Sequence, residues 1–189
     1  MNRIAVQFIA CLLIAFQIPA LSHAQNLKIS DFVLFSSGQT TIGSGCSFHR
    51  ESTSSIKGGA VGSYSLVKTN TNAVVLGNIH SGGIVQLDNY NKVTGNITSG
   101  ASLSKWAAVN IGKSAVITGN IDANGNIKIQ SGFVNGTITH PQKASYFGPK
   151  PSGGEISGTP SLPVLPELPT ITKFGNMGTL NISTSKTLS

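Results

Sequence analysis

A six-residue pattern recurs four times in the middle of the chain, and this repeat limits the fold more than any other feature. The four copies are residues 74–79, 92–97, 116–121 and 133–138, and a degenerate copy occupies residues 55–60. The fourth position of every copy is glycine: Gly58, Gly77, Gly95, Gly119 and Gly136. Because most of these glycines are spaced at a nearly constant interval, the chain has the short fixed period that is the sequence signature of a solenoid.

Each copy has the alternation of a half-buried β-strand. Successive side chains of a strand point to opposite faces. In the second copy, Val93, Gly95 and Ile97 would share the inner face, and Thr94 and Asn96 the outer face. The pattern therefore predicts one strand per copy, with the glycine at the centre of its inner face.

A second strand is expected in the remainder of each repeat. Val85 and Leu87 follow Ile79 as a second apolar pair, and Gly82 and Gly83 lie between the two expected strands. The one long interval, from Gly95 to Gly119, carries an insertion that contains the only tryptophan, Trp106. The repeat leaves no room for a connecting helix, so equivalent strands must stack directly on one another.

The fold predicted from the repeat is all-β: a single-stranded parallel β-helix (β-solenoid) with about 18 residues per coil. Identical positions would form columns along the axis, with Val and Ile inside, and Asn and Thr outside. A β-sandwich is the alternative, and in that fold the in-register copies would be coincidental.

The chain divides into four predicted segments. Residues 1–24 have the basic start, apolar run and small-residue cleavage site of a secretory signal peptide cut before Gln25. A membrane anchor that stays in place, or a lipoprotein attached at Cys11, are the alternatives. The β-helix would occupy residues 25–140, a Pro-rich extended segment residues 141–173, and the start of a further β segment residues 174–189. The last segment has no evident cap, so we expect the chain to be truncated.

The Pro-rich segment contains seven of the eight prolines and is expected to adopt a polyproline II conformation. It would form a stiff spacer or lie along the rod, because its Leu and Val side chains are too apolar for a free linker. Export would leave Cys46 as the single cysteine, and we expect it to be a small buried residue without a disulfide.

The ends of a solenoid expose unpaired strand edges, which need covering. Residues 31–35 are the most hydrophobic strand after the signal segment. We expect Phe32 and Phe35 to cap the N-terminal end or to take part in assembly there.

The repeat resembles that of the bactofilins, the polymer-forming cytoskeletal proteins. Residues 93–97 and their three counterparts, together with residues 127–129, carry the resemblance, which covers about residues 30–140. It implies a β-helix that polymerises end to end without a nucleotide. Bactofilins are cytoplasmic, whereas this chain begins with an export signal, so the resemblance is to exported surface proteins that carry bactofilin-like domains.

The sequence shows no catalytic or metal-binding pattern. The histidines after the signal segment, His49, His80 and His140, lack metal-ligand spacing, and each is expected at the surface. Asp122 stands at the repeat position of His80, which indicates a solvent-facing column. The six acidic residues are scattered, and no pair suited to general acid and base chemistry is evident. We expect no enzyme activity, no cofactor and no metal.

Two functions fit these features. The first is a secreted structural or adhesive solenoid at the bacterial cell surface, outer-membrane association included, which binds itself end to end or binds cell-surface polymers. The second is a ligand-binding solenoid for carbohydrate or ice. Its face, which would also serve for assembly, comprises Thr94, Asn96, Thr118, Asn120, Asn135 and Thr137. Neither nucleic-acid binding nor a membrane span after signal cleavage is expected: the basic residues form no run with aromatics. A polysaccharide-cleaving β-helix would need acidic residues clustered on one face.

Overall fold

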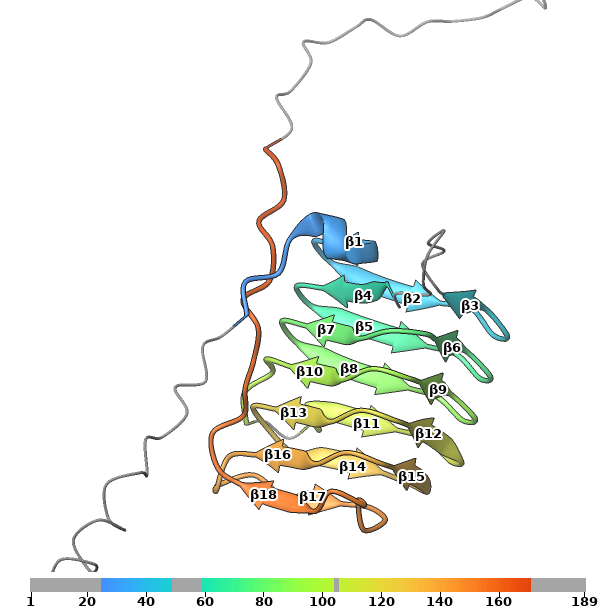
Figure 1. Ribbon diagram of the computed structural model, residues 1–189, viewed down its shortest axis with the longest axis vertical. Coiled ribbons are helices and arrows are strands. Elements are labelled where there is room, and N and C mark those ends of the chain that lie inside the picture. Colours follow the sequence, from blue (N-terminus) through green and yellow to red (C-terminus); the bar gives the residue numbers. More distant parts are fainter. Residues whose placement is uncertain (1–24, 49–58, 104–105, 171–189) are drawn as a thin grey trace, which may run out of the picture.

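The computed structural model describes residues 25–48, 59–103 and 106–170. It shows parallel strands stacked in successive coils, so the predicted parallel β-helix is confirmed (Figure 1). The predicted signal segment, residues 1–24, and the predicted further β segment, residues 174–189, lie outside the described residues, as does His49.

Three parallel sheets form the sides of the stack. The seven-stranded sheet contains β1 (Phe32–Ser36), β4 (Ala60–Ser63), β7 (Ile79–Ser81), β10 (Ile97–Ser99), β13 (Ile121–Ala123), β16 (Ile138–His140) and β18 (Glu155–Ser157). The six-stranded sheet contains β2 (Gln39–Ile42), β5 (Leu66–Thr69), β8 (Ile84–Leu87), β11 (Val109–Ile111), β14 (Ile127–Ile129) and β17 (Tyr146–Phe147). The five-stranded sheet contains β3 (Ser47–Phe48), β6 (Val74–Val75), β9 (Lys92–Val93), β12 (Ala115–Ile117) and β15 (Gly132–Val134). A short 3₁₀ helix, η1 (Ile29–Asp31), precedes β1.

Each complete coil has three strands, whereas the sequence predicted two. The repeated six-residue pattern is not one strand: in its second copy, Lys92 and Val93 form β9 and Ile97 begins β10. Gly95 and Asn96 form the corner between two sheets. The glycine therefore does not lie at the centre of an inner strand face, and the prediction of one strand per copy was wrong.

The core is a set of apolar columns along the axis, as predicted. Ile79, Ile97, Ile121 and Ile138 are paired in register in the seven-stranded sheet and are fully buried. Val75, Val93, Ile117 and Val134 form a second column in the five-stranded sheet, and Val67, Val85, Val109 and Ile127 a third in the six-stranded sheet. Burying one such side chain stabilises the fold by about 1.5–3 kcal/mol.

The corner glycines are required by the close approach of successive coils. A Cβ atom on Gly119 would lie 2.5 Å from the Oδ1 atom of Asn96 and 2.5 Å from the carbonyl oxygen of Gly95. Both atoms belong to the preceding coil, so a larger residue at this corner would push neighbouring coils apart.

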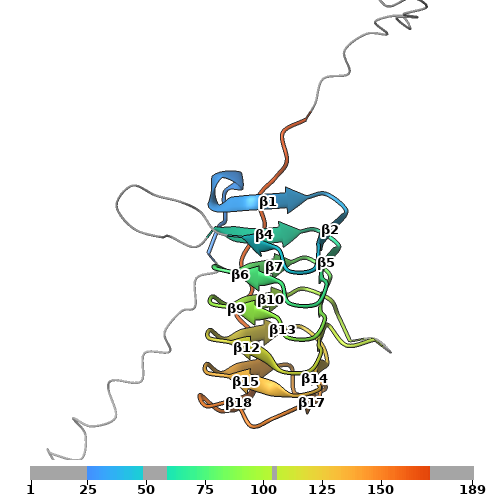
Figure 2. The same ribbon diagram turned by 90° about the vertical axis from the view of Figure 1, so that its right-hand side faces the viewer.

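The insertion lies in the coil that begins with β10. The step along the chain from Ile97 to its partner Ile121 is longer than the step from Ile79 to its partner Ile97. The additional chain leaves the stack between β10 and β11 (Figure 2). Leu103 is 43% exposed and Trp106 74% exposed, because the inner positions of this coil are taken by Val109 and Ile111.

The stacking continues beyond residue 140. β17 pairs with β14, and β18 pairs with β16, so the last strand of the stack ends at Ser157. The following residues, 159–170, are here called the strap. They run back along the outside of the seven-stranded sheet toward the N-terminal coil (Figure 1).

Candidate functional site

The six polar residues predicted to form a ligand face lie at the corner between the five-stranded and seven-stranded sheets. Strand pairing of β9, β12 and β15 aligns Thr94, Thr118 and Asn135 in one column, and Asn96, Asn120 and Thr137 in the next. All six are at least partly exposed. The structure therefore brings the predicted residues together on one edge of the rod.

The second of these columns is an asparagine ladder that holds the backbone. The Oδ1 atom of Asn78 accepts a hydrogen bond from the backbone N–H of Asn96 at 2.8 Å. Asn96 does the same for Asn120 at 2.9 Å, and Asn120 for Thr137 at 2.9 Å. A ladder of this kind satisfies a backbone donor at each corner, where the sheets do not. The repeated Asn thus has a structural role, and the first column stands outside the ladder.

Phe32 and Phe35, predicted to cap the N-terminal end, lie with their rings 4.7 Å apart between centroids. A Cβ atom on Gly62 of β4 would overlap the ring of Phe32 and would lie 2.8 Å from the Cδ2 atom of Phe35. The rings therefore cover the outer face of the seven-stranded sheet beside the first coil. Leu34, between them, is the residue that packs against the core.

The strap covers this same outer face. The backbone N–H groups of Leu27 and Val164 each donate a hydrogen bond of 3.0 Å, to Val164 and Gln25 respectively. The hydroxyl of Tyr64 donates to the carbonyl oxygen of Pro166. The outward column beneath the strap, called the covered column, contains Gly62, His80, Thr98, Asp122 and Thr139.

The interpretation of His80 as a surface residue was wrong, whereas Asp122 in the same column is partly exposed. His80 is 5% exposed and Thr98 6% exposed. The His80 Nδ1 atom lies 2.8 Å from the hydroxyl of Thr98, and the ring meets Phe32 edge to face. The Nε2 atom is buried and has no hydrogen-bond partner among the described residues.

Burial shifts the titration of both groups. Desolvation lowers the pKa of His80 to about 4, and the negative charge of Asp31 opposes this shift. Burial raises the pKa of Asp122, while hydrogen bonds from the Thr139 side chain and the Ser161 backbone oppose the rise. Uncharged His80 is therefore the form that the folded protein favours.

A polar cavity of about 310 Å³ lies between the strap and the sheet. Its lining includes His80 and Asp122 from the covered column, Asn78 from the asparagine ladder, and Pro163 from the strap. The residues that line this cavity are far apart in the sequence and share no motif.

The C-terminal end of the core has a polar lining. His140 occupies the inward position of β16 and is 3% exposed, which corrects its predicted surface placement. Its Nε2 atom lies 2.8 Å from Glu155 Oε1, and its Nδ1 atom lies 2.9 Å from the carbonyl oxygen of Pro141. Burial raises the pKa of Tyr146 to about 12, with the Glu155 charge adding to the shift.

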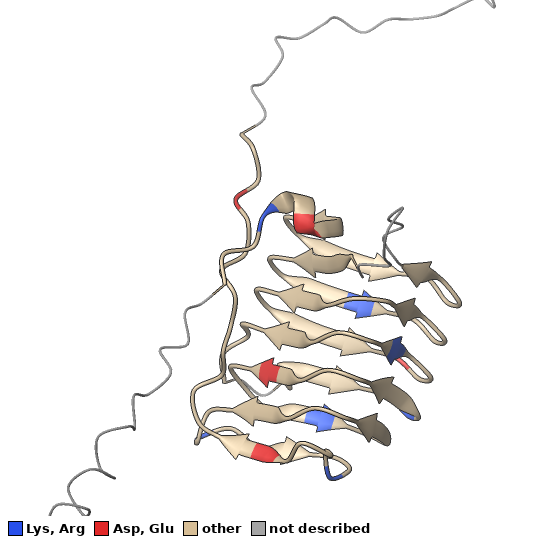
Figure 3. Cartoon of the chain, in the orientation of Figure 1, with Lys and Arg blue, Asp and Glu red and all other residues tan. Residues whose placement is uncertain are grey.

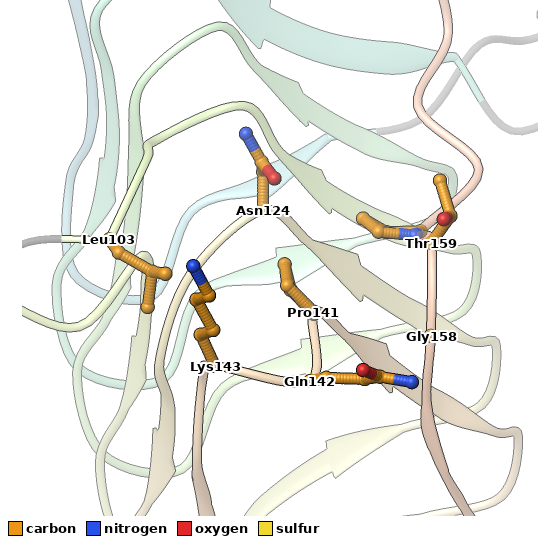
Figure 4. Close-up of a pocket in the computed structure, with 8 residues that line it drawn as sticks. Leu103, Asn124, Pro141, Gln142, Lys143, Gly158 and Thr159 are labelled. Carbon is orange, nitrogen blue, oxygen red and sulfur yellow. The ribbon is translucent and has the colours of Figure 1, made fainter.

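An apolar hollow of about 480 Å³ lies where the insertion meets the start of the strap (Figure 4). Leu103, Pro141 and Thr159 line it from three separate segments, and Asn124 and Lys143 supply polar groups at its edge. Its wall is built from loops.

The outer face of the six-stranded sheet carries a polar groove of about 460 Å³. Lys68, Gln86 and Asn110 line its floor, and Lys113 and Gln130 come from the turns at its side. Figure 3 shows basic residues on β5 and β14 of this sheet and acidic residues on β13 and β18 of the seven-stranded sheet. Sequence analysis missed this face because Lys68, Gln86 and Asn110 share a column but no residue type.

The part of the chain that the structure describes also bears on Cys46, on metal-ligand clusters and on membrane-spanning helices. Cys46 is exposed, so its predicted burial was wrong. No group of three or more His, Cys, Asp or Glu residues in residues 25–48, 59–103 and 106–170 could hold a metal ion. In these same ranges, no helix has the length and apolar character needed to cross a membrane.

No family model, no curated protein and no solved structure matches this chain.

Proposed function

We propose that this protein is an exported, non-catalytic solenoid with a structural or adhesive role at the bacterial cell surface. The strap is the observation that carries the proposal. In an ordinary solenoid each coil contacts only its neighbours, so coils can separate from the ends one at a time. Here one extended segment lies across most of the coils.

Contacts of the strap are distributed along the stack. Ser161 bonds Asp122 in β13 through its backbone. The carbonyl oxygen of Pro166 accepts a hydrogen bond from the hydroxyl of Tyr64, which follows β4. The backbone of Val164 forms hydrogen bonds with the chain before η1. Pulling two coils apart therefore also requires detachment of the strap. A rod that resists axial separation is suited to a structural or adhesive task.

The two ends of the rod support end-to-end assembly as one form of this role. β1 and β18 are the outermost strands of the seven-stranded sheet, so each has one edge that pairs with no strand of the described residues. Val33 near one end is 39% exposed, and Phe147 near the other end is 64% exposed. The resemblance of the repeat to bactofilins supports the same mode of assembly.

Export is tested by expressing the full chain in a bacterium and sequencing the N-terminus of the protein outside the cytoplasm. We expect a new N-terminus at Gln25, because residues 22–24 have the form of a signal peptidase site. Retention of the whole chain in the cytoplasm would contradict the proposed localisation.

Assembly is tested by negative-stain electron microscopy and light scattering on the same purified sample. End-to-end pairing predicts filaments, and a scattering mass that rises with protein concentration. Single rods at every concentration would remove end-to-end assembly and leave the adhesive form of the proposal.

A further inference from the structure

The outer face of the six-stranded sheet presents a polar column over five successive coils, and the column ends at the exposed Phe147 of β17. Strand pairing aligns five of its residues along the axis. These residues, here called the lysine face, are Thr41, Lys68, Gln86, Asn110 and Lys128. Their outward placement follows from the burial pattern, in which the residues on either side of Lys68 and Lys128 are buried and these two are not.

This face has a positive electrostatic bias. The strands of the six-stranded sheet contain two lysines and no Asp or Glu. Asp88 is the one acidic residue among those that line the groove, and its carboxylate accepts hydrogen bonds from the Thr71 hydroxyl at 3.1 Å and the Asn89 backbone N–H at 2.8 Å. Lys113 adds a further ammonium group to the same groove.

The other two faces of the described stack are less suited to a hydrophilic polymer. The strap lies over the seven-stranded sheet. On the five-stranded sheet the corresponding outward column includes Val74, Lys92, Val116 and Phe133. Val116 is 41% exposed and Phe133 49% exposed, so that face is partly apolar.

We infer that the lysine face binds an anionic polysaccharide whose chain lies along the rod axis. This inference rests on the proposed adhesive function and names its ligand. Coils repeat about every 4.8 Å, so a polymer of similar units meets a polar side chain at each step. The amides of Gln86 and Asn110 donate to and accept from sugar hydroxyls, and Lys68 and Lys128 pair with carboxylates.

Charge and side-chain chemistry favour a polysaccharide over a nucleic acid. Single-stranded nucleic acids bind to aromatic platforms and arginine-rich grooves. The strands of the six-stranded sheet contain no arginine, and their two aromatic residues, Tyr146 and Phe147, both lie in the last strand.

The test uses the full chain and polygalacturonate as a carboxylated probe, with dextran as the uncharged probe, in isothermal titration calorimetry at low and high salt. We expect binding of polygalacturonate that weakens as salt rises, because exposed charges are screened. The double variant Lys68→Gln/Lys128→Gln should lose about tenfold in affinity, as the removal of two exposed ion pairs predicts.

The matched control is Lys92→Gln/Lys150→Gln, which removes the same charge from other exposed positions. Thermal unfolding of both variants checks that they remain folded. Equal losses in the two double variants, no binding of polygalacturonate, or binding of single-stranded DNA at the same face with equal affinity would each overturn the inference. Failure here leaves export and assembly untouched, because their tests use N-terminal sequencing and microscopy.

Discussion

At the scale of single residues, the corner of each coil depends on two neighbours with different tasks. The glycine allows the backbone of one coil to approach the next, and the asparagine then bonds a backbone N–H of that next coil. Because successive coils reuse the corner, substitution at one position strains two adjacent coils. The repeated Gly-Asn pair in the sequence thus reflects how successive coils pack at each corner.

The variant Gly119→Ala tests this role. Its methyl group would lie 2.5 Å from Asn96 Oδ1 and from the carbonyl oxygen of Gly95, so we expect a loss of about 1–3 kcal/mol in the free energy of unfolding. Urea unfolding measures this loss. Gly38→Ala is the control, because a Cβ atom there meets nothing within 4 Å. Equal stability of the two variants would contradict the corner account.

Buried His80 should make the stability dependent on pH. Its pKa is lowered to about 4 in the folded state, against about 6.5 when unfolded, so only the unfolded state gains a proton as the pH first falls below neutrality. The stability that neutral His80 contributes is present above about pH 6.5 and is lost as the pH falls through about 4. The loss from this group should reach about 3 kcal/mol.

Urea unfolding between about pH 7 and about pH 4 measures the effect in the parent and in His80→Thr, which carries the residue found at Thr98 in the next coil. The variant should show the shallower pH dependence. Asp122, whose raised pKa acts in the opposite direction, is present in both proteins, so it cancels in the comparison. Parallel pH profiles of the two proteins would exclude His80 as the group responsible.

At the scale of elements, the strap changes the environment of a whole sheet face. It covers much of an outward column and forms one wall of the polar cavity beneath it. Its attachment combines backbone bonds near Val164 with the side-chain bond from Tyr64 to Pro166.

The variant Tyr64→Phe removes the bond to Pro166 and keeps the ring that packs against Phe35. We expect amide hydrogen exchange at Leu27 and Val164 to accelerate about fivefold, since a hydrogen bond contributes about 1 kcal/mol. Tyr90→Phe, at an exposed tyrosine, is the matched control and should leave this exchange unchanged. Unaltered exchange in Tyr64→Phe would show that this bond does not hold the strap.

The sequence predicted the elements that repeat and failed at those that do not. The columns of Ile97 and Val93 follow from spacing alone, because each coil must place the same residue at the same point. The burial of His80 depends on the ring of Phe32 and on the strap, neither of which has a counterpart in the repeat. The third strand was missed because two-residue strands such as β9 leave no alternation to detect. The lysine face was missed because its residues share polarity and not identity.

At the scale of the whole molecule, the stack and the strap form one object whose coils should not separate independently. Stability in solenoids is normally a sum of nearest-neighbour terms, and coils at the ends open more easily than those at the centre. The strap contacts both the coil of β13 and the region before η1, and these contacts join residues that are far apart in the sequence. The rod should therefore open as a single cooperative unit.

Native-state hydrogen exchange of the full chain at increasing denaturant tests this central claim most directly. The amides to follow are those of Val61 and Ile138 in outer coils, Ile97 in a central coil, and Val164 in the strap, all of which are hydrogen-bonded. We expect their opening free energies to converge within about 1 kcal/mol, because strap and coils open together. A graded decrease from Ile97 outward, with Val164 opening independently at the lowest free energy, would contradict the account of the strap as the element that unites the rod.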